Sequence, residues 1–258
     1  MNTQAPSASL QSSFLRPFWT GVIGPPWVVS LAVLALLAGI RFFAIFSPYS
    51  LQELFFLQVV GMWALPFAIL TAAGRRQIGL TERGMTFNSM VLSALAGAFC
   101  ALIFFFLGMF IYGDSPNNWC ISIRNYLHFD EMRGLMSPLE LFALYSLPAI
   151  FLNPIGEEIL FRGFIQQSFA RRFNPAVATL VNSILFGLVY LSVHGIWHDA
   201  SGFHLRVGSA ALALLLMICI GAVFTLCRMV SGSLWPAMAA HAAFNLTLLG
   251  TAIRVYLH

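Results

Sequence analysis

The chain has 258 residues, of which 59% are hydrophobic and only 9% are charged, and its mean hydropathy is +0.84. Soluble domains usually carry about 25% charged residues, so this chain has too few to cover a water-facing surface. The composition excludes a soluble enzyme, a disordered chain and a nucleic-acid-binding domain, and it predicts an integral membrane protein. The basic residues are all arginine and are scattered through loops, so the net charge of +4 does not indicate a nucleic acid or another polyanion as partner.

Apolar stretches of membrane-spanning length recur along the chain. A transmembrane helix needs about 20 mostly apolar residues, because each residue adds about 1.5 Å along the axis. Helices are expected because a backbone in lipid must satisfy its own hydrogen bonds. The predicted fold class is therefore all-α, a polytopic transmembrane helix bundle of about seven or eight helices. The predicted spans are 22–40, 54–73, 88–112, 139–171, 175–194, 207–227 and 234–251.

The fourth stretch, 139–171, is too long for one straight span. It contains Pro148 and Pro154, and each proline removes a helical hydrogen bond. We expect a kink or a break near Asn153-Pro154, which would divide this stretch into two helical pieces.

The chain divides into two parts at residues 138 and 139, where the fourth stretch begins. Residues 1–138 contain the N-terminal transmembrane helices and the longest polar loop, at about 113–137. Residues 139–258 contain the polar groups discussed below, so we expect them to form the functional core.

Arginine placement predicts the orientation in a cell membrane, because cytoplasmic loops carry an excess of basic residues. One set of arginines follows the second, fourth and sixth spans. With that side inside, seven spans place the N-terminus in the cytoplasm and the C-terminus outside. This set comprises Arg75, Arg76, Arg83, Arg171, Arg172 and Arg228, and the opposite side holds Arg41, Arg124, Arg133, Arg206 and Arg254.

Three charged residues lie inside the fourth stretch, where charge is expensive and is usually kept for function or a buried pairing. On a helix, Glu158 and Arg162 are one turn apart and can pair. Such a pair by itself would be explained by helix packing, but a second, adjacent carboxylate would not. Glu157 points about 100° away from Glu158 and is expected to be unpaired. An unpaired carboxyl in an apolar site suits proton exchange near neutral pH.

Two further stretches carry polar groups at helical spacing. His241 and Asn245 are one turn apart on one helical face, after a loop and helix start marked by Gly232 and Pro236. A lone histidine would more often be a packing residue, but the asparagine and the glutamate pair favour a polar site. Asn182, Phe186, Tyr190 and His194 recur every four residues and also share a face.

The depths of these groups can be compared at about 1.5 Å per residue. Glu158 lies about 21 Å from Arg172, Tyr190 about 22 Å from Pro175, and His241 about 14 Å from Gly232. If those three helix ends share one membrane interface, the polar groups meet within the bilayer.

Together these three segments resemble the CAAX-protease and bacteriocin-processing family of intramembrane endopeptidases, which includes type II CAAX prenyl endopeptidases. That family is recognised by Glu-Glu-x-x-x-Arg, Phe-x-x-x-His and His-x-x-x-Asn. Here the first motif is Glu157-Glu158-Ile-Leu-Phe-Arg162 and the third is His241-Ala-Ala-Phe-Asn245. The resemblance covers roughly 139–250, so residues 139–258 are expected to form a CAAX-protease-like core.

The second motif departs from the family pattern, because Tyr190 occupies the histidine position in Phe186-Gly-Leu-Val-Tyr190. Tyrosine is a weak general base near neutral pH, although its hydroxyl can orient a water or donate to an oxyanion. We expect His194, one turn later on the same face, to be the functional replacement. The alternatives are that Tyr190 alone serves the site or that the chain is impaired or inactive.

The resemblance implies an endopeptidase that uses a water molecule activated by Glu157. A histidine of the second motif would assist, His241 and Asn245 would stabilise the oxyanion, and Glu158 with Arg162 would be the supporting pair. The substrate is expected to be a peptide or a membrane-associated protein in a lipid bilayer, with no nucleic acid partner. No cofactor is expected because His-Glu-x-x-His is absent, and zinc is the less favoured alternative.

Two other interpretations remain open. The cluster of His194, His198, Asp199 and His204 after the fifth stretch would suit a metal if the first two histidines lay on one helix. The chain would otherwise be a non-proteolytic membrane protein of the same fold, such as a scaffold, a maturation partner or an immunity factor, and Tyr190 is the feature that favours this.

Overall fold

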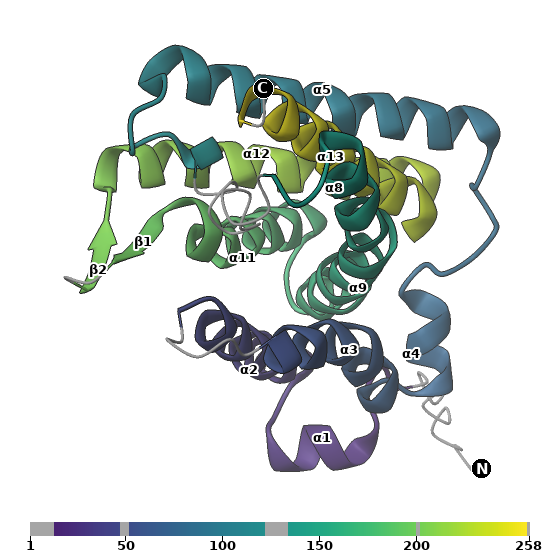
Figure 1. Cartoon of the computed structure of the whole chain (residues 1–258). Coiled ribbons are helices and arrows are strands. Elements are labelled where there is room, and N and C mark those ends of the chain that lie inside the picture. Colours follow the sequence, from purple (N-terminus) through teal and green to yellow (C-terminus); the bar gives the residue numbers. More distant parts are fainter. Residues whose placement is uncertain (1–12, 47–51, 122–133, 200–201, 257–258) are drawn as a thin grey trace, which may run out of the picture.

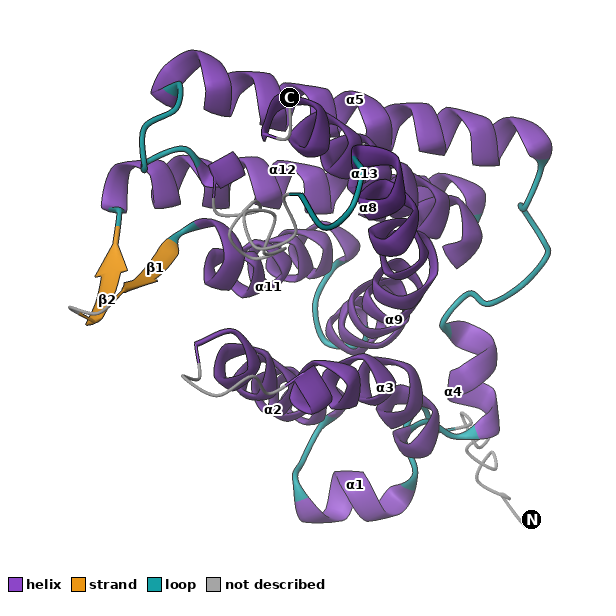
Figure 2. Cartoon of the chain, in the orientation of Figure 1, coloured by secondary structure: helices purple, strands orange, loops and turns teal. Residues whose placement is uncertain are grey.

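The computed structural model describes residues 13–46, 52–121, 134–199 and 202–256, and in this part the chain is almost entirely helical (Figure 2). A single antiparallel hairpin is the only sheet found there. The first elements are α1 (Pro17–Val22), α2 (Pro26–Phe46), α3 (Gln52–Ile69), α4 (Ala72–Gln77) and α5 (Phe87–Tyr112). There follow α8 (Pro138–Leu147), η1 (Pro148–Leu152), α9 (Asn153–Glu158), η2 (Ile159–Ile165), α10 (Gln166–Ala170), α11 (Pro175–His194), β1 (Ile196–Asp199), β2 (Gly202–Leu205), α12 (Val207–Ser231) and α13 (Leu234–Tyr256).

The predicted all-α membrane bundle is confirmed, and the chain is a multi-pass membrane protein. In the part of the chain that the structure describes, five helical segments are long and apolar enough to cross a membrane. A shorter apolar helix, Glu53–Ile69, and the 23-residue α13 occupy the second and the last predicted spans. The five are Pro26–Phe46, Phe87–Tyr112, Pro138–Ala170, Pro175–His194 and Val207–Ser231. Part of the predicted polar loop, 122–133, lies outside the described residues, with Arg124 and Arg133 in it.

Of the kink or break predicted near Asn153-Pro154, the break is wrong, because the segment from Pro138 to Ala170 stays helical throughout. It changes from α-helix to π-helix twice, at η1 and at η2. The amide N–H of Asn153 bonds to the carbonyl of Pro148, five residues back. This wider turn lets the backbone pass two prolines that cannot donate, without ending the helix.

The bundle has the helix of 138–170 at its centre. On one side it packs against α13, which in turn packs along α5, and on the other side it contacts α3, which pairs with α2 (Figure 1). Helices α11 and α12 pack together and complete the bundle. Gly97 on α5 permits the close approach to α13, since a Cβ there would lie 1.8 Å from the backbone oxygen of Ala240.

Hydrogen bonds gather several helix ends at one face of the bundle. Arg171, after α10, donates to Gln77 of α4. Arg228, near the end of α12, donates to the Ile78 carbonyl at 3.5 Å. The first amide of α13, at Leu234, donates to the Gly79 carbonyl at 2.8 Å. Two of the arginines predicted to lie on one side, Arg171 and Arg228, therefore reach the neighbouring residues Gln77 and Ile78. With these helix ends together, polar residues at similar depths on the helices come to one level.

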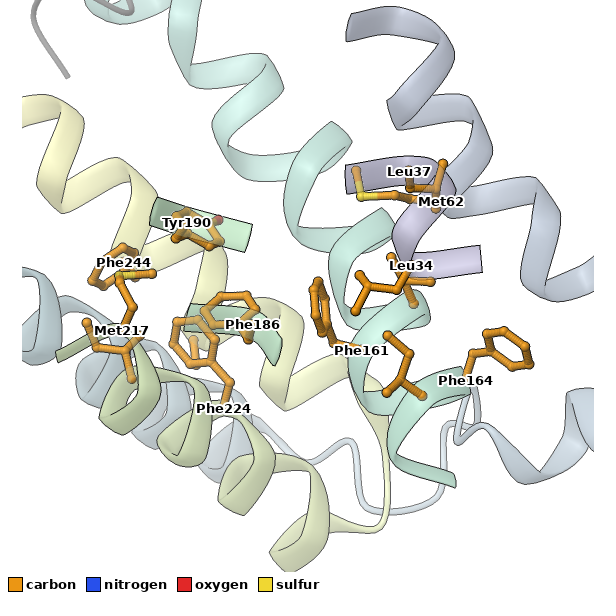
Figure 3. Packing of buried hydrophobic residues seen from close by; sticks show 14 of the residues in the cluster. Leu34, Leu37, Met62, Phe161, Phe164, Phe186, Tyr190, Met217, Phe224 and Phe244 are labelled. Atoms are coloured by element: carbon orange, nitrogen blue, oxygen red, sulfur yellow. The ribbon is translucent and has the colours of Figure 1, made fainter. Parts of the chain in front are cut away.

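Side chains from most helices form one apolar core around this level. Figure 3 shows Phe186 and Tyr190 of α11 beside Phe224 of α12, with Phe161 of η2 between this group and the leucines of α2. Phe186 and Phe224 are fully buried. Any polar group in this core is therefore surrounded by rings rather than by water.

Candidate active site

Glu157 and Glu158 end α9, directly before the π-helical segment η2. Both side chains are buried, at 1% and 0% relative exposure. π-Helical turns inside α-helices are frequent at functional sites. Two adjacent carboxylates in such a core need counter-charges and hydrogen bonds, which α2, α11, α13 and η2 supply.

Arg162 of η2 neutralises Glu158, as the spacing predicted. Its Nη1 lies 3.0 Å from Glu158 Oε1, and its Nη2 donates to the Gly221 carbonyl of α12 at 2.9 Å. The guanidinium carbon is 4.4 Å from the ring centre of Phe186 and 5.3 Å from that of Phe224. Arg162 is thereby fixed by one carboxylate, one carbonyl and two aromatic faces.

His241 of α13 joins the two glutamates. Its Nδ1 lies 2.8 Å from Glu158 Oε1, and its ring stacks on Phe224 with centroids 4.9 Å apart. Its Nε2 lies 3.7 Å from Glu157 Oε2 and 3.4 Å from the Tyr190 hydroxyl. A histidine held by a carboxylate at one nitrogen presents the other nitrogen in a defined direction, here towards Glu157.

Glu157 is not unpaired, and that expectation from the sequence is wrong. The Tyr190 hydroxyl donates to Oε2 at 2.8 Å, and Arg41 Nη1 of α2 donates to Oε1 at 3.2 Å. From the sequence, Arg41 is predicted to lie at the end of the first span, on the side opposite to the cytoplasmic arginines. In the structure its side chain is buried, at 6% relative exposure. A lone charge near the end of an apolar helix was the available signal, since such charges are usually kept for a buried partner.

His194 lies beside Tyr190 and does not take its place at Glu157. The two rings stack with centroids 5.9 Å apart, and Phe104 lies 5.1 Å from the His194 ring. Its Nδ1 has no hydrogen-bond partner among the described residues. The structure thus brings Tyr190 to the carboxylate and places His194 one turn further away.

Asn245 follows His241 by one turn, as predicted, but its amide reaches a different partner. Nδ2 donates to the Ala149 carbonyl of η1 at 3.2 Å. Asn245 is partly buried and ties α13 to the π-helical turn that precedes the glutamates. It therefore lies at the margin of the cluster formed by Glu157, Glu158, Arg162, Tyr190 and His241.

The histidine cluster considered for a metal is not built on one helix. Helix α11 ends at His194, and His198 belongs to β1, where it pairs with Phe203 of β2. The side chains of His198 and Asp199 lie outside the described part of the chain, and His204 is exposed. Among the described residues, no group of three or more His, Cys, Asp or Glu side chains is placed to hold a metal ion.

Comparison with known proteins finds a family match for the part of the chain that holds this cluster. No curated protein and no solved structure matches the chain. Residues 139–247 match the sequence model of the family described as type II CAAX prenyl endopeptidase Rce1-like. The matched range contains both glutamates, Arg162, Tyr190, His194, His241 and Asn245. The resemblance predicted from the three motifs is confirmed: residues 139–247 of this membrane protein are similar to the Rce1-like family.

Proposed function

We propose that the chain is an intramembrane endopeptidase in which Glu157 activates the attacking water. The match to an endopeptidase family supports peptidase activity in general. The observation that carries the finer proposal is the contact of Glu157 with Tyr190 at 2.8 Å and with His241 at 3.7 Å inside a buried core. A carboxylate beside oriented donors is what general-base hydrolysis requires.

The proposed reaction follows from these positions. Glu157 takes a proton from a water molecule while the water oxygen attacks the carbonyl carbon of a peptide bond. His241, with a proton on each ring nitrogen, donates from Nε2 where the negative charge develops on the carbonyl oxygen. Tyr190, whose single O–H goes to Glu157, holds the carboxylate. The second N–H of the Asn245 amide, whose first donates to Ala149, is a further donor. The proton then passes from Glu157 to the leaving nitrogen as the carbon–nitrogen bond breaks.

Glu158 and Arg162 have a supporting role in this proposal. Glu158 holds His241 through Nδ1, in the way that a carboxylate orients the histidine of a serine protease triad. Arg162 balances the charge of Glu158. The substrate is a peptide or a membrane-associated protein whose backbone enters the bundle from the bilayer or its surface.

A second candidate is a non-proteolytic membrane protein of the same fold. Tyr190 in place of the family histidine favours it, because a phenol titrates far above neutral pH in ordinary surroundings. This alternative predicts that neutralising Glu157 leaves the cellular function intact.

The test is to compare the wild-type chain with Glu157→Gln, which keeps the shape and removes the base. Purified protein in lipid nanodiscs is given mixed quenched-fluorescent peptides, and newly formed N-termini are profiled in membranes of cells expressing each form. We expect Glu157→Gln to lower cleavage by about 10²- to 10⁴-fold, the range contributed by a general base.

Glu82→Gln is the matched control, because Glu82 is exposed in the loop before α5. It should cleave like the wild type. Equal product from wild type and Glu157→Gln, or no product from either, would reject the protease and favour the non-proteolytic candidate.

A further inference from the structure

Arg41 is the feature of the site that the family match leaves unexplained. It lies on α2, almost 100 residues before the matched range 139–247 begins. Helix α2 is mostly apolar, and Arg41 carries the one charge between Pro26 and Phe46. A buried arginine in such a helix is costly and calls for a compensating contact.

Within the described part of the chain, Glu157 provides a compensating contact. Arg41 Nη1 donates to Oε1 of the carboxylate at 3.2 Å, and the Tyr190 hydroxyl donates to Oε2 at 2.8 Å. The two donors come from different helices, α2 and α11, and hold one oxygen each. The guanidinium carbon of Arg41 also lies 5.0 Å from the centre of the Tyr190 ring, so the two donors support each other.

Charge balance shows why this contact matters to the cluster. Glu158 is paired with Arg162, so Arg162 is already engaged by the neighbouring carboxylate. Arg41 supplies a second positive charge, so that among the described residues two guanidinium groups face two carboxylates. Removing one partner of such a buried pair leaves an uncompensated charge in an apolar core.

We infer that Arg41 is a positioning residue for Glu157, and that α2 therefore contributes to the active centre built on 139–247. Together with Tyr190, it fixes the plane of the carboxylate that receives the proton of the water. A reacting group displaced by about 1 Å can lose about 10²-fold in rate. The expected effect on kcat rests on the proposed function. The contact between Arg41 and Glu157 rests on the geometry alone.

The kinetic test uses the full chain in nanodiscs with a peptide cleaved by the wild type. Arg41→Gln should lower kcat by about 10²-fold with KM within about twofold, because the base is misplaced while peptide binding is retained. Arg41→Lys keeps the charge with one donor group and should recover part of kcat. Arg83→Gln, on an exposed loop residue, should match the wild type. An unchanged kcat in Arg41→Gln, or a loss confined to KM, would overturn the inference.

A second measurement is independent of cleavage. Thermal unfolding is recorded for Arg41→Gln, Glu157→Gln and the double variant. If the two side chains form the pair described, the double variant is less destabilised than the sum of the single variants. Additive effects would overturn the inference even if the chain is a protease. Cleavage that persists in Glu157→Gln would instead reject the proposed function while the coupling is still observed.

Discussion

Tyr190 is in direct contact with the two groups that define the site, Glu157 and His241. Its hydroxyl lies 2.8 Å from the carboxylate and 3.4 Å from the imidazole. In the proposed mechanism Tyr190, as a weak base but a good donor, holds the carboxylate of Glu157, and Glu157 accepts the proton. The tyrosine at this position keeps α11 connected to the glutamates through its hydroxyl.

The comparison of Tyr190→Phe with His194→Ala decides between these two residues. Tyr190→Phe removes a hydrogen bond to a charged group, worth about 1.5–3 kcal/mol, so kcat should fall about 10- to 100-fold. His194→Ala should keep kcat within about threefold, a change of under 1 kcal/mol, because its ring touches Tyr190 and not Glu157. Single-turnover rates with a cleaved peptide measure both. If Tyr190→Phe changes kcat only slightly and His194→Ala is inactive, His194 is the functional replacement, as predicted from the sequence.

The packing of α5 against α13 sets the position of His241. A Cβ at Gly97 would lie 1.8 Å from the backbone oxygen of Ala240, the residue directly before His241. Backbone atoms cannot rotate away as a flexible side chain does. An added methyl group must therefore push the two helices apart.

Gly97→Ala is expected to lower the free energy of unfolding by about 1–3 kcal/mol, the cost of overpacking a core, and to reduce cleavage. Gly39→Ala is the control, because a Cβ at Gly39 on α2 meets no atom within 4 Å. That change should be neutral or stabilising by up to about 1 kcal/mol, from the better helix propensity of alanine. The unfolding midpoints of both variants are measured in detergent. Equal midpoints for Gly97→Ala and Gly39→Ala would contradict this account.

The whole molecule has an arginine-rich face and an opposite face, and its orientation in the membrane stays a prediction. The loop with Arg83 precedes α5, and Asp114 follows it at the other end of the same helix. If cytoplasmic loops hold the excess of arginine, Glu82 lies inside and Asp114 outside.

Cysteine labelling in intact cells tests this orientation. In a chain whose native cysteines are replaced by alanine, Asp114→Cys should react with an impermeant maleimide from outside. Glu82→Cys should react only after the membrane is opened. Both positions are exposed, so access depends on the side of the membrane. The opposite pattern of labelling would place the N-terminus outside.

The number and place of the membrane helices could be predicted from the sequence, because hydropathy and length act locally and lipid forces the backbone to be helical. The Glu158–Arg162 pair could be predicted for the same reason, as one helical turn joins the two residues. The grouping of three helices at one level followed from counting residues from their ends. The π-helical turns at Pro148 and Ile159 were not predicted, because proline indicates a lost hydrogen bond but not how the helix adapts.

Only the tertiary structure decided which partner each buried group reaches. Arg41 and Glu157 are 116 residues apart, and nothing local in either segment fixes how α2 is rotated against α9. The same holds for Tyr190 and His194, which share one face of α11 but differ by one turn in depth. Helical periodicity determines the face on which a side chain lies, whereas the contact it makes depends on the rotation and the axial offset of the neighbouring helix. These are set by packing, such as the close approach at Gly97, and no short sequence pattern encodes them.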